Sequence, residues 1–242
     1  SITLQSTRNG YGCDQQYTLD LVTGALKLVS TGTGRVTCGY YGITTEDMLW
    51  PTVEPRFVIY SSTHESLGPE CPPRADMSLG YVWAIYPYDI YMADLDGQII
   101  RNVTDSPGYD AEGTLDWNSN WLYFTSNRDG DMDIYRQNLQ SEEIERLTDE
   151  VGYDGGPFIS PDGEHIVYRR TFFTNAQEEQ EYKDLLAQNL VRPSKLDLMV
   201  MDADGSNKRR LTANGVANFA PYLHPDGETI IFCSNLGSQG AA

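Results

Sequence analysis

The chain has 242 residues, of which 17 are lysine or arginine and 35 are aspartate or glutamate, so its formal net charge is −18. This acidity argues against a nucleic-acid-binding protein, because neutralising phosphates requires clustered lysine and arginine. No stretch approaches the roughly 18 consecutive apolar residues of a membrane span. A composition of 40% hydrophobic and 11% aromatic residues excludes a disordered chain and suffices for a sizeable core.

Short runs of β-branched and aromatic residues predict strands along the whole chain. One helix is predicted at 177–190, where glutamate, glutamine and leucine dominate and Pro193 follows. In chain order, the predicted strands are 2–7, 15–21, 25–30, 38–43, 56–62, 88–94 and 99–104, followed by four-stranded units over 111–148 and 155–212 and two strands at 217–224 and 229–234.

An internal repeat organises these strands. Asp89-Ile90-Tyr91 recurs 44 residues later as Asp133-Ile134-Tyr135. Gly108-Tyr109-Asp110 recurs as Gly152-Tyr153-Asp154 with the same step of 44 residues. Independent markers at one offset indicate that each unit is a copy of one supersecondary structure.

Two steps in the repeat are longer. Pro161-Asp162-Gly163 recurs as Pro225-Asp226-Gly227 after 64 residues, which indicates an insertion of about 20 residues. We place the insertions at about 63–87 and 172–195. Both follow the second strand of a unit, so we expect them to emerge at the same end of the fold.

Four short strands in about 44 residues are typical of a β-propeller blade. The predicted fold is therefore all-β, one β-propeller domain over 1–242 with four-stranded antiparallel blades and two loop insertions, one of them helical. The chain accounts for about 4.5 blades. Either the partial blades at the two ends close a five-bladed ring, or the chain is part of a larger ring. We favour a six-bladed ring, because neither end carries a natural terminal signal.

The repeat unit resembles the PD40 (WD40-like) repeats of TolB-like β-propellers. The closest copies run from Leu147-Thr148 to Gly163 and from Leu211-Thr212 to Gly227. The resemblance implies an extracytoplasmic bacterial protein, periplasmic or extracellular, that acts through protein–protein contacts. Similar repeats occur as non-catalytic propellers of serine peptidases and in some polysaccharide lyases, so the fold alone does not decide the function.

The predicted function is an exported, non-catalytic interaction or scaffold subunit, acting as an accessory on the outer face of a membrane-bound complex. The alternative is a propeller enzyme, either a hydrolase or lyase with a metal site at the channel mouth, or the propeller of a serine peptidase. The sequence has no Gly-x-Ser-x-Gly motif. Its histidines, His64, His165 and His224, fall in different units. We interpret them as turn or strand-edge residues, the alternative being a metal or base role for His64 and His224 near one end of the ring.

Carboxylates offer two candidate sites for a hard cation such as Ca²⁺, and no other cofactor is expected. Asp129, Asp131 and Asp133 alternate along one turn, a pattern that suits oxygen coordination. Asp110 and Asp154 precede the innermost strands, where they would line an acidic channel mouth. The alternative is that Asp129 and Asp131 are solvated acids of a hairpin turn, and that Asp133, Asp110 and Asp154 hydrogen-bond neighbouring backbone and only maintain the fold.

The two insertions are the features that exceed the bare repeat, and function tends to reside in such loops. They are predicted to form the surface for a protein partner, since exposed aromatic residues are typical interface anchors. The alternative is that both simply pack on the propeller. The predicted anchors are Tyr81, Trp83, Tyr86, Tyr182, Leu185 and Leu186.

The four cysteines, Cys13, Cys38, Cys71 and Cys233, show no metal-binding spacing. Of the possible pairings we favour Cys13–Cys38, because these residues flank one short hairpin. The bond is expected only outside the cytosol. Cys233 lies in an apolar strand and is predicted to be a buried thiol.

Overall fold

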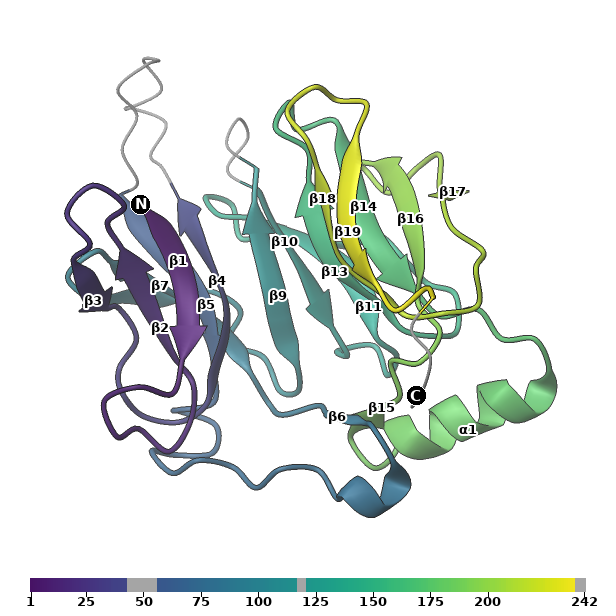
Figure 1. Cartoon of the computed structure of the whole chain (residues 1–242), viewed down its shortest axis with the longest axis horizontal. Coiled ribbons are helices and arrows are strands. Elements are labelled where there is room, and N and C mark those ends of the chain that lie inside the picture. Colours follow the sequence, from purple (N-terminus) through teal and green to yellow (C-terminus); the bar gives the residue numbers. More distant parts are fainter. Residues whose placement is uncertain (43–55, 117–120, 238–242) are drawn as a thin grey trace.

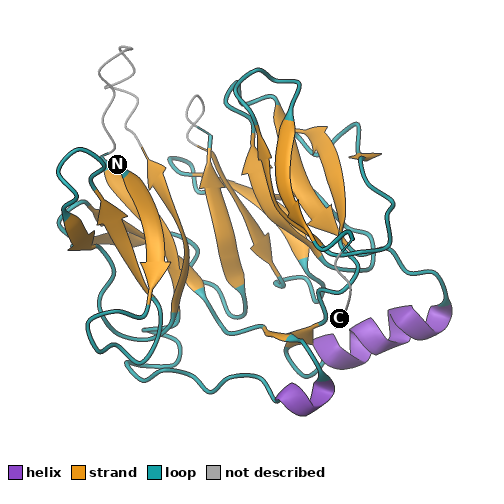
Figure 2. Cartoon of the chain, in the orientation of Figure 1, coloured by secondary structure: helices purple, strands orange, loops and turns teal. Residues whose placement is uncertain are grey.

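The computed structural model describes residues 1–42, 56–116 and 121–237, which fold into a row of antiparallel sheets (Figure 1). Strands dominate, and helical segments are confined to the insertions (Figure 2). No helix in these ranges is long and apolar enough to cross a membrane.

In the described part of the chain, three sheets have four strands each, ordered from the innermost strand outwards as they follow in the chain. This arrangement confirms the predicted blades. The strands are β4 (Val36–Gly42), β5 (Phe57–Ser62), β7 (Asp89–Asp94) and β8 (Ile99–Asn102); β9 (Asp110–Leu115), β10 (Trp121–Ser126), β11 (Asp133–Asn138) and β12 (Ile144–Arg146); and β13 (Asp154–Ile159), β14 (His165–Arg170), β16 (Asp197–Asp202) and β17 (Arg209–Arg210).

Two smaller sheets flank the complete ones within the described residues. The first has three strands, β1 (Ile2–Ser6), β2 (Gln15–Leu19) and β3 (Leu26–Leu28). The last has two, β18 (Asn218–Leu223) and β19 (Ile230–Ser234). Both match the predicted partial blades. Cys233 of β19 is exposed, contrary to the prediction of a buried thiol, because β18 is the only described strand that pairs with β19.

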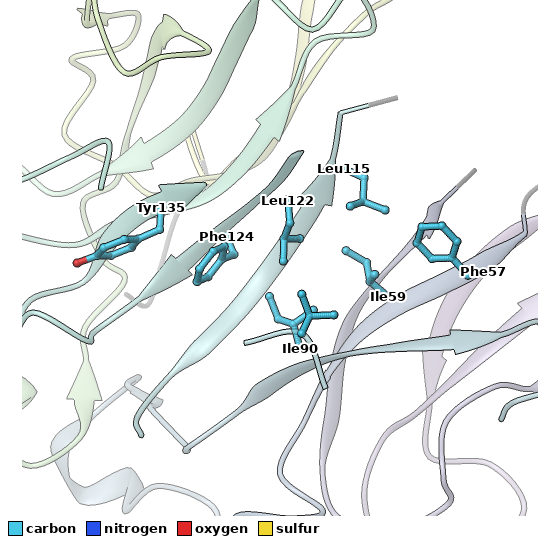
Figure 3. Close-up of a cluster of buried hydrophobic side chains, with 8 residues drawn as sticks. Phe57, Ile59, Ile90, Leu115, Leu122, Phe124 and Tyr135 are labelled. Carbon is cyan, nitrogen blue, oxygen red and sulfur yellow. The ribbon is translucent and has the colours of Figure 1, made fainter. Parts of the chain in front are cut away.

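Neighbouring sheets pack face to face and bury large apolar side chains between them. Figure 3 shows one such cluster, in which Phe57 and Ile59 of β5 meet Leu122 and Phe124 of β10. Each side chain of this size contributes about 1.5–3 kcal/mol when it is fully buried. Because one sheet cannot cover both of its own faces, the row of sheets depends on this stacking.

A hydrogen-bond network explains why threonine and aspartate recur in the repeat. The Thr148 hydroxyl accepts from the backbone N–H of Ile134 (2.9 Å) and donates to the carboxylate of Asp133 (2.8 Å). It thereby ties the fourth strand of its sheet to the third. The same pair recurs in the sheets on either side, as Thr104 with Asp89 (3.3 Å) and as Thr212 with Asp197 (3.0 Å).

The two insertions meet at one end of the sheets, as predicted (Figure 1). The first contains a short 3₁₀ helix, η2 (Met77–Leu79), and the strand β6 (Trp83–Ala84); the second contains α1 (Ala176–Leu186) and β15 (Leu190–Val191). β6 and β15 pair antiparallel, with Trp83 opposite Val191. Segments from two different blades therefore form one small sheet, which we call the cap.

The helix α1 begins where the sequence supplies a capping residue. The Asn175 side chain accepts hydrogen bonds from the backbone N–H groups of Gln177 and Glu178 (3.0 Å each), which stabilises the first turn. The helix ends at Leu186, earlier than the predicted 190, because Asn189 adopts a left-handed conformation (φ 57°) that helices do not continue.

The predicted Cys13–Cys38 disulfide is wrong. Cys13 is bonded to Cys71, and their Cα atoms are 5.5 Å apart. The first insertion folds back so that the Cys71 side chain packs beside Gly12, whereas Cys38 sits on the innermost strand β4 as a free thiol. The disulfide therefore ties the first insertion to the loop between β1 and β2.

Candidate functional site at the capped channel

Each of the four innermost strands, β4, β9, β13 and β18, carries a β-bulge at the same point of the repeat. The bulge residue has a positive φ in every case, between 47° and 60°. All four bulge residues border one cavity, so the same backbone feature converges on the channel from four sheets. Their side chains differ completely: Cys38, Glu112, Gly156 and Ala220.

Glu112, the bulge residue of β9, forms an ion pair with Arg169 of β14. The Glu112 carboxylate accepts a short hydrogen bond from the Arg169 guanidinium and a second from the Tyr153 hydroxyl (2.7 Å). It also accepts from the backbone N–H of Gly156 (3.0 Å). The Arg169 guanidinium leaves room only for glycine at position 156, since a Cβ atom there would lie 2.2 Å from Nη2.

The electrostatics of this pair favour ionisation of the acid. Burial acts to raise the pKa of Glu112, but the Arg169 charge and the hydrogen bonds from Tyr153, Arg169 and Thr125 outweigh it and lower the pKa below its ordinary value. The neighbouring thiol behaves oppositely. Burial, followed by the Glu112 charge, raises the pKa of Cys38 to about 11, so the thiol is protonated and a poor nucleophile at neutral pH.

The pair borders two cavities, each of about 490 Å³, which share Cys38, Glu112 and Arg169. One lies under the first insertion and has a largely aromatic wall. The other follows the inner strands beyond the bulges, away from the insertions. The first cavity includes Arg35 and Arg74 in its lining, so the sequence prediction of an acidic channel mouth is wrong at this end.

Asp110 and Asp154 do not line either cavity, contrary to prediction. Both side chains are fully buried. Asp110 pairs with Arg128 (3.0 Å) and Asp154 pairs with Arg170 (3.0 Å). Burial raises the pKa of both carboxyls, and the arginine partners oppose this. These aspartates hold the starts of the inner strands.

The other three predicted metal ligands also have protein partners. Asp133 pairs with Arg146, Asp129 accepts from the Tyr135 hydroxyl, and Asp131 accepts from the backbone N–H of Gly152, at 2.6, 2.7 and 3.0 Å. In the described part of the chain, the five predicted aspartates do not converge as a ligand set. The one group of three close candidate ligands found there is Asp162, Glu164 and His165, and all three are exposed.

The predicted interaction residues divide between surface and interior. Tyr81 is 58% exposed, and Trp83 and Tyr86 are half-buried. The prediction that Tyr182 and Leu185 lie on the surface is wrong: both are buried, Tyr182 in a core cluster against which Leu186 is partly buried. The reason is that α1 turns its apolar face inwards, where Tyr182 packs against Phe173 at 5.5 Å between ring centroids.

The histidines lie at different ends of the fold. His64 follows β5 at the capped end, whereas His224 follows β18 at the opposite end, so the idea that both lie near one end is wrong. The ring of His64 contacts the Ser62 hydroxyl (2.8 Å). That serine recurs as Ser126, which accepts from the backbone N–H of Arg128 (3.2 Å). The serine is therefore a repeated turn residue rather than a nucleophile.

Sequence reasoning missed Glu112 and Arg169, although both break the repeat. Glu112 occupies the position of Gly156 and Ala220 in later units. Arg169 takes a position held elsewhere by small residues, namely Ser61, Thr125 and Cys233. Aligning the repeats would have revealed both residues, because each is a large charged residue at a position where the other units have a small one.

Comparisons with known proteins agree with this architecture. Residues 86–181 match the family model "TolB beta propeller domain" (PD40). TolB from Acinetobacter baumannii has a similar structure, with a TM-score of 0.63 and 16% identity over 94% of this chain. This chain spans 44% of that TolB chain.

Other solved structures share the fold at low identity. A chain of a nidogen/laminin complex has a TM-score of 0.57 and 12% identity, covering 96% of this chain and 69% of that one. A Mycobacterium tuberculosis puromycin-hydrolyzing peptidase has a TM-score of 0.56 and 13% identity, covering 96% of this chain and 32% of that one. No curated protein matches the sequence. Its repeat and its sheets give the described chain the fold of a β-propeller, and over residues 86–181 it is similar to TolB propellers.

Proposed function

We propose that this chain belongs to an exported, non-catalytic protein that binds other proteins, with the cap and the adjoining rim of the propeller as its binding surface. The observation that carries the proposal is the joining of the two insertions. They pair as β6 and β15, and Arg192 of the second donates to the backbone carbonyl of Leu79 in the first (2.9 Å) across 113 residues of sequence.

The ordered structure of the cap favours a role in protein recognition over simple packing of loops on the propeller. Trp83 lies between the rings of Tyr153 (6.0 Å) and Phe219 (5.8 Å), so its position is set by the inner strands. Tyr81 lies beside Trp83 and stays 58% exposed, and its hydroxyl accepts a hydrogen bond from the Trp83 indole (3.1 Å). An exposed aromatic residue on a rigid support is the usual form of an interface anchor.

The Cys13–Cys71 bond supports a periplasmic or extracellular location, because disulfides persist in oxidising compartments. The TolB likeness supports the same location and, as the finer proposal, a role as accessory subunit on the outer face of a membrane-bound complex. That a similar fold comes from a nidogen/laminin complex also supports protein recognition.

Catalysis is not part of the proposal. The thiol at the channel is held protonated, and the serine beside His64 is a repeated turn residue. The likeness to a peptidase leaves one alternative, in which the propeller adjoins a hydrolase domain. A full reading frame with Gly-x-Ser-x-Gly in an α/β-hydrolase segment would overturn the proposal.

The direct test is photocrosslinking in intact cells that express the full-length protein. A photoreactive phenylalanine analogue replaces Tyr81 in the cap, and a matched control replaces Val22, which is 96% exposed in the β2–β3 turn away from the cap. We expect position 81, and not position 22, to form a defined adduct with a protein of the cell envelope. Equal labelling from both positions, or none from position 81, would contradict the proposal.

A further inference from the structure

We infer that the cavity under the first insertion binds a small carboxylate-bearing ligand with a ring or other flat body. The inference concerns a small molecule or chain terminus inside the channel, so it goes beyond the protein-binding surface proposed above. It stands on the charge of the cavity lining, on one unsatisfied arginine N–H and on the aromatic walls.

The lining is cationic in a strongly acidic protein. Arg35, Arg74 and Arg169 face the cavity against a single carboxylate, Glu112, which Arg169 already neutralises. Neither Arg35 nor Arg74 has a carboxylate partner among the residues that the structure describes. In a chain of net charge −18, two guanidinium groups kept free of acids at one cavity indicate an anionic ligand.

Arg169 adds a donor at the inner end of the cavity, where it also borders the second cavity. Its Nη2 is used by Glu112 and by the Tyr153 hydroxyl (2.9 Å), and the side chain is only 8% exposed. Its Nε–H is buried and has no acceptor in the described chain. A buried charged donor without an acceptor is costly, and a carboxylate oxygen would satisfy it.

The walls suit an organic body rather than a bare inorganic ion. They carry the aromatic side chains Tyr81, Trp83, Tyr86, Tyr88, Tyr109 and Tyr153. The volume of about 490 Å³ is in the range of cavities that take ligands of drug size, about 300–1,000 Å³. Aromatic faces stack on flat rings, and a planar carboxylate matches the guanidinium fork.

The exposure of the lining residues gives the ligand an orientation. Arg74 and Tyr81 are exposed and mark the entrance, whereas Arg169 and Tyr153 are buried at the inner end. The carboxylate would therefore enter first, pass Arg35 and meet Arg169, with the ring left between the tyrosines and Trp83.

Isothermal titration calorimetry on the purified chain tests this with matched probes. One pair is N-acetyl-L-phenylalanine and its amide, which represents a peptide carboxyl terminus; the other is glucuronate and glucose, which represents a sugar acid. Inorganic phosphate is a fifth probe. We expect at least one carboxylate to bind, its uncharged counterpart to show no measurable heat, and phosphate to bind more weakly. The pair that responds identifies the source of the carboxylate.

Variants locate the site. Arg35→Gln and Arg74→Gln should each weaken binding of the responding carboxylate about tenfold, because each removes one charged contact. Arg74 is exposed, so its variant is expected to fold like the native chain. The control is Arg209→Gln, an exposed arginine on the outer strand β17, which should leave binding unchanged. The inference is overturned if no carboxylate binds, if the amide or phosphate binds equally well, or if the control weakens binding as much as Arg74→Gln.

Discussion

The inner strands carry buried charges at two levels, which are positions two residues apart along the strand. Asp110 and Asp154 occupy the first level, and Glu112, with its partner Arg169, marks the second. The two levels differ in one respect. Asp110 and Asp154 recur at the same point of the repeat, and each meets an arginine of its own unit, Arg128 in the β10–β11 turn and Arg170 at the end of β14. Glu112 and Arg169 occur once, in two different sheets, and border both cavities. The comparison teaches that repeated charges hold each sheet together, whereas charges that break the repeat mark the site.

The largest effect is expected from Glu112→Gln. The substitution leaves the buried Arg169 guanidinium without its counter-charge, so the free energy of unfolding in urea should fall by about 3–5 kcal/mol. The control is Glu142→Gln, which removes the 71% exposed partner of Arg101 and should cost less than about 1 kcal/mol. Equal losses from the two variants would mean that the Glu112–Arg169 pair is not held out of water.

The disulfide stabilises the first insertion, not the repeated part of the sheets. Cys71→Ser should lower the free energy of unfolding by about 2–4 kcal/mol, because it releases a constraint across 58 residues of sequence. Cys38→Ser is the matched control and should change stability little. If Cys38→Ser lost as much as Cys71→Ser, the pairing described here would be incorrect.

The repeated network predicts a smaller loss. Thr148→Val leaves the Ile134 N–H and the Asp133 carboxylate each short of a partner, so we expect a loss of about 1–3 kcal/mol in the same unfolding measurement. Thr148→Ser keeps the hydroxyl and should recover most of this. A serine variant as unstable as the valine variant would show that the methyl group, not the hydroxyl, matters.

The contributions of the two levels to folding stability should also change with pH in opposite directions. The folded state lowers the pKa of Glu112 from 4.5, so its contribution to stability is present above that value and is lost as the pH falls through the folded pKa. The folded state raises the pKa of Asp154 above 3.8 because of burial, so ionisation of that group costs stability as the pH rises through the folded pKa.

Unfolding curves recorded from acid to neutral pH check this difference. Relative to Glu112→Gln, the native chain should lose stability on acidification. Relative to Asp154→Asn, it should gain stability on acidification. Slopes of the same sign would remove the distinction between the two levels.

Local sequence signals sufficed for the sheets. The threonine and aspartate of each unit, such as Thr148 and Asp133, act within one sheet, so their spacing in the sequence predicts their contact. Strand bounds follow the runs of β-branched and aromatic residues closely. The number of blades in the whole ring stays a prediction.

The site depends on contacts that no local pattern encodes. Glu112 meets Arg169 across 57 residues, and β6 meets β15 across two blades. Cys71 reaches Cys13 only because the first insertion folds back. Each of these contacts joins segments that are far apart in the sequence and lie together only in the folded chain, and for this reason the sequence predicted the insertions but not what they enclose.

The central claim is that charged residues that break the repeat form the binding site, while the polar residues that recur in each unit maintain the fold. Thermal unfolding of Arg35→Gln and Thr148→Val, with and without a saturating carboxylate probe, tests it directly. We predict that Arg35→Gln keeps the native midpoint and loses the rise produced by the probe, whereas Thr148→Val lowers the midpoint and keeps the rise. The reverse pattern, or the loss of the rise in both variants, would contradict the claim.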